Sequence, residues 1–396
     1  MIDALMKDRF ELPDGITYLD GNSLGPLSRD AALAIRDITR GEWASDLIAS
    51  WNKHDWFDAP ERVGDLIAPL IGADKGEVVV ADSVSVNIFK LAAAALEAQP
   101  GRHVILSEPG NFPTDLYMIE GLKRLRPEIE LRLVARDEMA DALDDEVALL
   151  MLTHVHYKTA EMFDMAALTS VAQAAGALTL WDLSHSVGAV PVDLNGANAD
   201  LAVGCGYKYL NGGPGAPAFL YVAKRHQEAL VSPLSGWMGH AEPFAFTDDY
   251  RPDEAIRRWR AGTPPMLSLA SLEAGVKMMR EADFTDVIAH SRALTERFIE
   301  RVEADCGEHV ELLSPRDPAA RGSHVSFRHE NAYAVMQALI AAGVTGDFRT
   351  PDALRFGFAP LYNDEADVDT AAKALSEILE DGRWQEARFQ ARETVT

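Results

Sequence analysis

The sequence predicts an α/β fold, with a large domain built on a mostly parallel, seven-stranded sheet and a smaller α+β domain. Two observations lead to this prediction. After about residue 60, short apolar runs alternate with amphipathic stretches, which is typical of βαβ units and of a parallel sheet covered by helices on both faces. After about residue 265, helical patterns dominate. We place the large domain at residues 30–270 and the smaller domain at residues 1–29 and 271–396.

Seven apolar runs of strand length supply the large sheet. They are Val78–Ala81, Val104–Ser107, Leu131–Val134, Ala148–Leu152, Leu178–Asp182, Leu201–Gly204 and Ala218–Val222. Between them, helices are predicted at Val84–Glu97, Thr114–Leu125 and Met165–Ala175. Beyond them, we expect helices at Met266–Glu281, His290–Ala304, Ala332–Ala342 and Val368–Leu379 and a strand at His324–Arg328. Because parallel sheets bind ligands at the carboxyl ends of their strands, the residues that follow each strand are candidates for a site.

Composition narrows the class of protein. The chain has 396 residues, of which 47% are hydrophobic and 25% charged, the usual balance of a globular protein. Its net charge of -25 argues against nucleic acid and against anionic membranes as partners. The opening stretch MIDALMKDRFELPDG lacks the pattern of a signal peptide, and Cys205 and Cys306 form no zinc-binding pair. We expect a cytoplasmic protein without a metal site.

The segment Leu201–Gly215, LAVGCGYKYLNGGPG, is the strongest signal of chemistry. An apolar strand leads to Lys208, which has a tyrosine on each side and a glycine-rich turn after it. A partly buried lysine has a more neutral and nucleophilic amine, as the covalent attachment of pyridoxal 5′-phosphate (PLP) requires. The glycines would let the backbone approach such a cofactor. A surface lysine in a hairpin turn is the alternative interpretation.

Asp182 ends the strand Leu178–Asp182 and is followed by Ser184 and His185. A carboxylate at this place would keep a pyridinium nitrogen protonated, so that the ring of PLP acts as an electron sink. His185 would stack on that ring or form a hydrogen bond with Asp182. A helix N-cap at Asp182 and a core histidine at His185 are the alternatives. The combination with Lys208 favours a PLP site.

Two predicted helix starts add candidates for the same site. In Asp82–Asn87, DSVSVN, the free N–H groups, the helix dipole and the hydroxyl of Ser85 would bind a phosphate, although plain N-capping explains the pattern as well. In Asn111–Asp115, NFPTD, Phe112 would cover one face of a cofactor ring. Thr114 and Asp115 of that motif would either cap the helix or contact the ligand.

Eight segments, in order along nearly the whole chain, together resemble bacterial kynureninase. They are YLDGNSLGPLS (Tyr18–Ser28), NFPTD (Asn111–Asp115), THVHYKTAEMFDM (Thr153–Met165), WDLSHSVGAVPVDL (Trp181–Leu194), GYKYLNGGPGAP (Gly206–Pro217), GWMGH (Gly236–His240), RAGTPP (Arg260–Pro265) and LRFGFAPLYN (Leu354–Asn363). The resemblance implies a PLP enzyme of fold type I, in the aminotransferase class V group. It also implies a homodimer that cleaves L-kynurenine to anthranilate and L-alanine in tryptophan catabolism, with 3-hydroxykynurenine as a further candidate substrate.

The resemblance further implies roles for individual residues. The implied PLP contacts are Val84, Ser85, Phe112, Thr114, Asp115, Asp182, His185, Tyr207, Lys208, Trp237 and Thr263. Lys208, Asp182 and Tyr207 resemble the catalytic residues, with Tyr207 binding phosphate and transferring protons. Trp237 and Thr263 resemble residues that approach the site across a dimer interface. Ser85 stands where many relatives have threonine, and this substitution keeps the hydroxyl.

Arg355 resembles the arginine that holds the α-carboxylate of the substrate, for which a bidentate guanidinium is well suited. Half of an ordinary ion pair is the alternative for this residue. We expect Thr263 and the region Trp51–His54 to line the aromatic end of the substrate.

Three other interpretations stay open at this stage. Lys158 is a rival lysine, although no glycine-rich turn follows it. Cys205, close to Lys208, suggests a cysteine desulfurase, but a small packing residue is expected there, and Cys306 reads as a helix end. An aminotransferase, or a non-catalytic relative that uses the fold for binding, is the remaining alternative.

Overall fold

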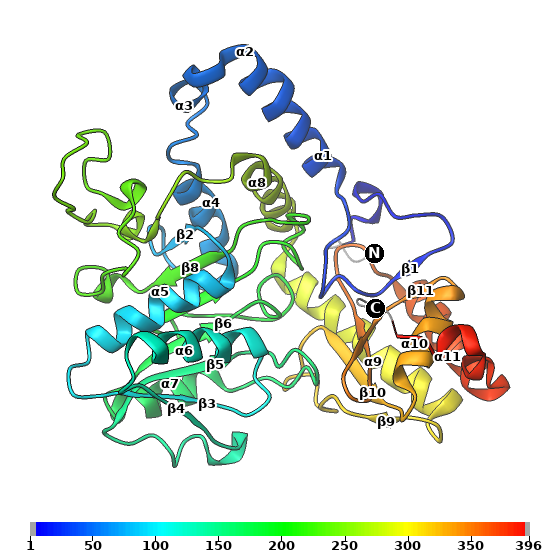
Figure 1. Ribbon diagram of the computed structural model, residues 1–396. Helices are drawn as coiled ribbons and strands as arrows, with labels where there is room; N and C mark the ends of the chain where they lie inside the picture. The colour runs from blue at the N-terminus through cyan, green and yellow to red at the C-terminus, as the bar shows by residue number, and fades with distance from the viewer. Residues whose placement is uncertain (1–4, 393–396) are drawn as a thin grey trace.

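A computed structural model describes residues 5–392 of the chain, and its main feature is a seven-stranded sheet (Figure 1). The strands lie in the order β2-β8-β7-β6-β5-β3-β4. Their bounds are β2 Val78–Val80, β3 Val104–Ser107, β4 Glu130–Leu133, β5 Val147–Thr153, β6 Leu178–Asp182, β7 Leu201–Gly204 and β8 Phe219–Val222. Only β8 runs against its neighbours, and the other pairs are parallel. The prediction of a mostly parallel sheet is confirmed.

The direction of β8 follows from the segment that precedes it. Residues 205–218 contain no helix, so nothing carries the chain back for a parallel crossover. The chain instead reverses direction in an irregular loop, in which Asn211, Gly213 and Gly215 have φ angles of 55°, 79° and 76°. Such left-handed conformations favour glycine and asparagine. This turn is the segment that contains Lys208.

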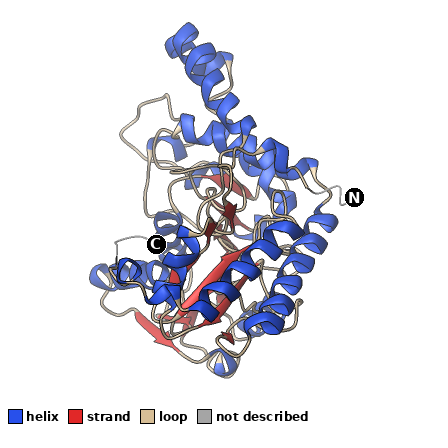
Figure 2. Ribbon diagram, turned by 90° about the vertical axis from the view of Figure 1, so that its right-hand side faces the viewer, coloured by secondary structure: helices blue, strands red, loops and turns tan. Residues whose placement is uncertain are grey.

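Helices cover both faces of the sheet (Figure 2), and its strands are mostly buried, except for the edge strand β4, whose residues are exposed or half-buried. Successive strand residues point to opposite faces. Val78 and Val80 therefore belong to one hydrophobic cluster and Val79 to another. The first cluster packs against α4 (Ala59–Ile67), α7 (Met165–Ala174) and α8 (Met266–Glu281). The second packs against α5 (Val84–Glu97) and α6 (Pro113–Leu125).

A four-stranded sheet in the order β12-β13-β10-β9 lies beside the large one (Figure 1). Its strands are β9 Glu311–Leu312, β10 His324–Arg328, β12 Asp347–Arg349 and β13 Ala353–Gly357, and its helices are α9 Phe284–Cys306, α10 Ala332–Ala341 and α11 Glu365–Asp381. These elements share a third cluster that includes Phe298, Phe327 and Leu375. The pairing of β1 (Thr17–Tyr18) with β11 (Val344–Thr345) brings the N-terminal segment to this side. The division at residues 30 and 270 stays a prediction.

An arm projects from the body between the N-terminal segment and α4 (Figure 1). It consists of α1 (Arg29–Arg36), a π-helical segment (Asp37–Trp43), α2 (Ala44–Asp46) and α3 (Ser50–Lys53). Leu47 and Ile48 at its tip are 65% and 81% exposed. Within residues 5–392, no helix combines the length and the apolar character needed to cross a membrane.

Candidate active site

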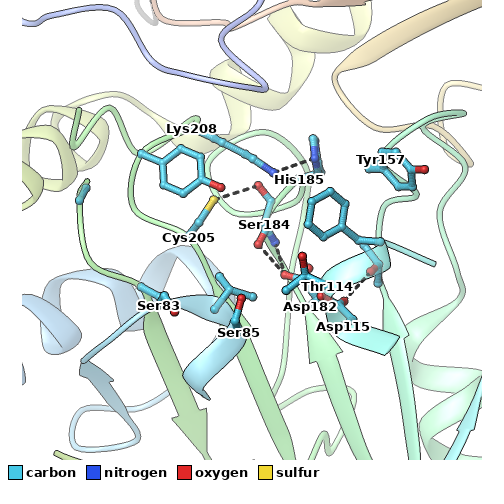
Figure 3. A pocket seen from close by; sticks show the side chains of 16 residues that line it. Ser83, Ser85, Thr114, Asp115, Tyr157, Asp182, Ser184, His185, Cys205 and Lys208 are labelled. Atoms are coloured by element: carbon cyan, nitrogen blue, oxygen red, sulfur yellow. Dashed lines mark hydrogen bonds between the residues drawn. The ribbon is translucent and has the colours of Figure 1, made fainter. Parts of the chain in front are cut away.

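A cavity of about 220 Å³ opens at the carboxyl ends of β5, β6 and β7 and at the start of α5 and α6 (Figure 3). Nine of the residues predicted from the sequence line it. They are Val84, Ser85, Phe112, Thr114, Asp115, Asp182, His185, Tyr207 and Lys208. Seven further residues line the cavity that were not predicted as site residues, namely Ser83, Thr153, Tyr157, Ser184, Cys205, Ala216 and Ala218. These candidates therefore meet at the edge of the sheet where parallel strands end, as the sequence analysis predicts.

Lys208 extends its amine toward His185, and Nζ lies 2.8 Å from Nε2 (Figure 3). Both side chains are buried, and burial lowers the pKa of each. A lysine with a lowered pKa is neutral in a larger fraction of molecules and is a better nucleophile. The expected bond from His185 to Asp182 is not present, and Nδ1 of His185 is buried without a partner. The alternative of a surface lysine is wrong.

Asp182 and Asp115 place two carboxyl groups at the floor of the cavity. Asp182 accepts hydrogen bonds from the backbone N–H of Ser184 (2.8 Å) and from its hydroxyl (2.6 Å). Asp115 accepts from the hydroxyl of Thr153 at 3.3 Å, and its other oxygen is buried without a partner. Burial raises the pKa of both groups, and the charge of Asp182 raises the pKa of Asp115 further. Among the described residues, Lys208 is the cation whose charge acts on both carboxyl groups.

The start of α5 forms the opposite wall of the cavity. Ser83 is the N-cap, and its hydroxyl accepts from the N–H of Val86 at 3.4 Å. Val84 and Ser85 belong to the first turn, whose N–H groups have no partner inside the helix. Together with the hydroxyl of Ser85 and the helix dipole, they form a site suited to a phosphate.

PLP fits this set of groups. The start of α5 suits its phosphate, and the two buried carboxyl groups would be compensated by a protonated ring nitrogen. Lys208 lies 5.9 Å from the ring centroid of Phe112 and 5.8 Å from that of Tyr207, so both aromatic rings border the amine. Asp182, His185 and Lys208 would hold the ring.

Arg355 lies outside the cavity lining and is fully buried on β13, with 1% of its side chain exposed. Its Nε donates to Asp347 at 2.7 Å, and its Nη1 donates to the carbonyl of Tyr157, a residue of the cavity wall. Arg355 is therefore one residue removed from the cavity. Lys158, the rival lysine, instead bonds to Asp352 at 3.2 Å and does not line the cavity.

Trp237, Thr263 and the region Trp51–His54 also lie outside the Lys208 cavity. Trp237 is 42% exposed and lines a different cavity, together with His240 and Tyr250. Thr263 is exposed. His54 bonds to Asp46 at 2.9 Å within the arm. Within a single chain these residues do not join the site, so their roles stay predictions.

Thr153, Tyr157 and Ser184 were missed as individual residues. Thr153 ends β5, so the rule that singled out Asp182 on β6 applies equally to it. Ser184 follows Asp182 by two residues and fixes its carboxylate. Tyr157 had no comparable signal, because an irregular segment after β5 brings it to the ring of Phe112, with centroids 5.3 Å apart.

Both cysteines of the chain are buried. Cys205 is 2% exposed, and burial raises the pKa of its thiol. Cys306 is 2% exposed at the end of α9, and burial raises its pKa to about 11. A thiol with a raised pKa is a poor nucleophile. Neither thiol therefore has the exposure and the low pKa of a reactive cysteine.

Solved structures of PLP enzymes share the fold. An apo cysteine desulfurase from Thermococcus onnurineus NA1 has a TM-score of 0.80, with 19% identity over 95% of this chain and 97% of that one. A C-DES mutant with glycine covalently linked to the PLP cofactor has a TM-score of 0.81, with 17% identity over 94% of this chain and 99% of that one. At this level of identity the likeness concerns the fold alone.

Sequence relatives are much more similar. Residues 287–375 match the family described as kynureninase C-terminal domain. Kynureninase from Burkholderia pseudomallei is 50% identical over 99% of this chain and 96% of its own length. Kynureninase from Pseudomonas fluorescens is 48% identical over the same shares of both chains. The chain belongs to the kynureninase family.

Proposed function

We propose that this protein hydrolyses L-kynurenine to anthranilate and L-alanine with PLP as its cofactor. The observation that carries the proposal is the cavity that brings Lys208, Asp182 and the start of α5 together in a chain of this family. In the balanced reaction, water adds its hydroxyl to the γ carbon of the substrate. The bond between the β and γ carbons breaks, and the β carbon gains a proton.

When bound, PLP supplies the electron sink for this bond cleavage. Lys208 would hold the cofactor covalently, and its amine, once released, would take the proton from the α carbon of the substrate. Burial supports this role because it favours the neutral amine. Asp182 would keep the ring nitrogen protonated. Tyr207, which lines the same cavity, would deliver a proton in the later steps.

The remaining contacts follow from the same geometry. Val84 and Ser85 would bind the phosphate, and Phe112 would cover the ring, with Thr114 and Asp115 beside it. Arg355 would bind the substrate α-carboxylate near Tyr157. 3-Hydroxykynurenine, which has one additional hydroxyl on its aromatic ring, is a further candidate substrate under this proposal.

We propose a homodimer in which Trp237 and Thr263 reach the site of the partner chain. The support is the exposed aromatic surface around Trp237, where Phe244 and Phe246 are 62% and 79% exposed. Large exposed apolar patches of this kind usually mark a surface that binds another protein chain. The tip of the arm, with Leu47 and Ile48, is a second exposed apolar surface. We also propose a cytoplasmic location, in keeping with two free cysteines.

Anthranilate fluorescence after L-kynurenine is added to protein supplied with PLP tests the proposal. We expect anthranilate and L-alanine in equal amounts. Formation of neither product, in a protein that shows the absorption of bound PLP, would contradict the substrate and leave the cofactor assignment in place. Sulfide release from L-cysteine under the same conditions would favour a desulfurase.

A further inference from the structure

The surroundings of Arg355 raise a question about how a substrate carboxylate is held. Its Nε and Nη2 both donate to the carboxylate of Asp347, Nη2 also donates to the hydroxyl of Ser23 at 2.8 Å, and Nη1 donates to the carbonyl of Tyr157. These bonds use four of the five N–H groups of a guanidinium. Arg355 alone therefore lacks the free pair of donors that a bidentate carboxylate contact needs.

A second arginine lies against the same aspartate. Nη2 of Arg349 donates to Asp347 at 2.5 Å and to the hydroxyl of Ser23 at 3.1 Å. Its Nε is buried and has no partner, while 34% of its side chain stays exposed, against 1% for Arg355. Arg349 thus keeps donors that Arg355 has already used.

The charges of this cluster do not cancel. Two guanidinium groups, those of Arg349 and Arg355, face the single carboxylate of Asp347. The other acid nearby is Asp20, and burial together with the charge of Asp347 raises its pKa to about 8. Asp20 is therefore mostly neutral at pH 7, which leaves the cluster with one uncompensated positive charge. Because the side chain of Arg349 is only partly exposed, this positive charge favours the binding of an anion at the cluster.

The cluster acts on the Lys208 cavity. Burial lowers the pKa of Lys208 most strongly, and the positive charges of Arg355 and Arg349 lower it further. The same two charges lower the pKa of His185. His324 adds a further polar group at this place, because its ring lies 5.3 Å from that of His185 and both of its nitrogens are buried without partners. A polar ligand between the cavity and the two arginines would therefore lie near the nitrogen atoms of Lys208, His324 and the arginines.

We infer that Arg349 binds the α-carboxylate of the substrate jointly with Arg355, and that Asp347 is the positioning residue that aims both guanidinium groups. This inference rests on the proposed function, since that function requires an α-amino acid as substrate. The negative charge of Asp347 orients the two arginines and compensates one of their two positive charges. The remaining positive charge matches one carboxylate, which makes the site selective for amino acids over amines and amides.

The test compares L-alanine with L-alaninamide, which lacks the carboxylate. Each is titrated into the PLP-loaded protein, and binding is followed by the change in the absorption of bound PLP. We expect the unchanged protein to prefer L-alanine. In Arg349→Gln, the ratio of the two dissociation constants should fall at least about tenfold, the size expected for one charge-assisted contact. Arg349→Lys, which keeps the charge without the fork, should lose less.

Two further variants separate positioning from general damage. Asp347→Asn removes no arginine but replaces one accepting oxygen by an NH₂ group that faces a guanidinium, so the ratio should fall here too. Arg328→Gln is the matched control, because Arg328 is an arginine of the same small sheet whose partners are Glu311 and Asp352. Its ratio should not change.

The inference is overturned if Arg349→Gln keeps the preference of the unchanged protein, including the case in which both ligands weaken equally. It stands if the preference falls, even where L-kynurenine is not cleaved. In that case the proposed function fails and the carboxylate site remains. If the protein cleaves L-kynurenine but Arg349→Gln keeps the unaltered preference, the proposed function stands and the role of Arg349 is refuted.

Discussion

The amine of Lys208 lies 2.8 Å from Nε2 of His185 inside a cavity that buries both side chains. Burial lowers the pKa of Lys208 and of His185. The neutral forms of the two groups are therefore favoured where they lie against each other. This contact distinguishes Lys208 from the remaining lysines near the site. Lys158 has an ordinary ion pair with Asp352, and the buried Lys90 on α5 donates to Asp82 at 2.6 Å.

Replacing Lys208 with Ala should abolish the near-visible absorption of lysine-bound PLP and should lower kcat by about a hundredfold to ten-thousandfold, because the proton acceptor is lost. The measurements are the absorption spectrum and anthranilate fluorescence. Lys158→Ala is the control and should keep the spectrum. Persistence of the absorption in Lys208→Ala, or its loss only in Lys158→Ala, would refute the assignment.

Asp182→Asn should leave PLP bound but should lower kcat by about a hundredfold or more, because an amide cannot keep the ring nitrogen protonated. Asp115→Asn is the contrasting variant. Burial and the charge of Asp182 hold the pKa of Asp115 well above its usual range, which favours the neutral form of its carboxyl, the form that an amide resembles. Its kcat should fall much less. Equal losses in the two variants would show that Asp182 has no special role.

Ser85→Ala should weaken PLP binding by about tenfold to a hundredfold, the effect of one lost hydrogen bond to a charged group. Ser83→Ala should act differently, because the hydroxyl of Ser83 already caps α5. We expect it to lower the free energy of unfolding by about 1 kcal/mol. PLP titration and thermal unfolding of the apo-protein distinguish the two. The phosphate assignment fails if Ser83→Ala weakens PLP binding while Ser85→Ala lowers only the stability of the apo-protein.

Trp237→Ala and Lys208→Ala chains, each impaired alone, should regain activity when they are mixed and allowed to form dimers. In a mixed dimer, one site has Lys208 from one chain and Trp237 from the other. The activity should approach a quarter of the unchanged level at equal mixing, since about half of the dimers are mixed and each has one complete site. If Trp237 serves the site of its own chain, no mixed dimer has a complete site and mixing restores nothing.

The pH dependence of kcat/KM should show an alkaline fall that belongs to Asp20. The pKa of its carboxyl is raised to about 8, mainly by burial and then by Asp347, while Arg355 and Ser23 oppose the shift. Below that pH the group is neutral and the arginine cluster is positive. Above it, the added negative charge cancels the cluster and weakens the binding of a carboxylate.

Asp20→Asn cannot ionise, so its kcat/KM should stay higher than that of the unchanged protein above about pH 8. The measurement is a pair of pH profiles with L-kynurenine as substrate. Other groups that titrate in this range affect both profiles, and only their difference reports on Asp20. Superimposable profiles would exclude Asp20 as the source.

The large sheet and the Lys208 cavity could be predicted because their signals are local. Each strand is a short apolar run, and Asp182 and Lys208 follow such runs directly. The helix at Met266–Glu281 and the strand at His324–Arg328 were predicted with the bounds that the structure has. Helix α9 starts at Phe284, earlier than predicted, because Asp283 caps it ahead of its most regular apolar pattern.

The arginine cluster could not be predicted, because its contacts depend on elements without a local signal. Strand β12 has three residues, and only its pairing with β13 sets Asp347 opposite Arg355. Ser23 comes from an irregular N-terminal segment, and no periodic pattern relates it to the small sheet. The antiparallel direction of β8 could not be predicted either, because it depends on the absence of a helix between β7 and β8, which the structure shows for residues 205–218.

The bond from Arg355 to Ser23 joins residues 332 positions apart, and this separation matters during synthesis on the ribosome. The groups that surround Lys208 come from a shorter stretch, between Ser83 and Ala218. A growing chain therefore contains every residue of the cofactor cavity long before β12 and β13 exist. Ser23 is synthesised 332 residues before Arg355, so the arginine cluster can form only after β13 has been made.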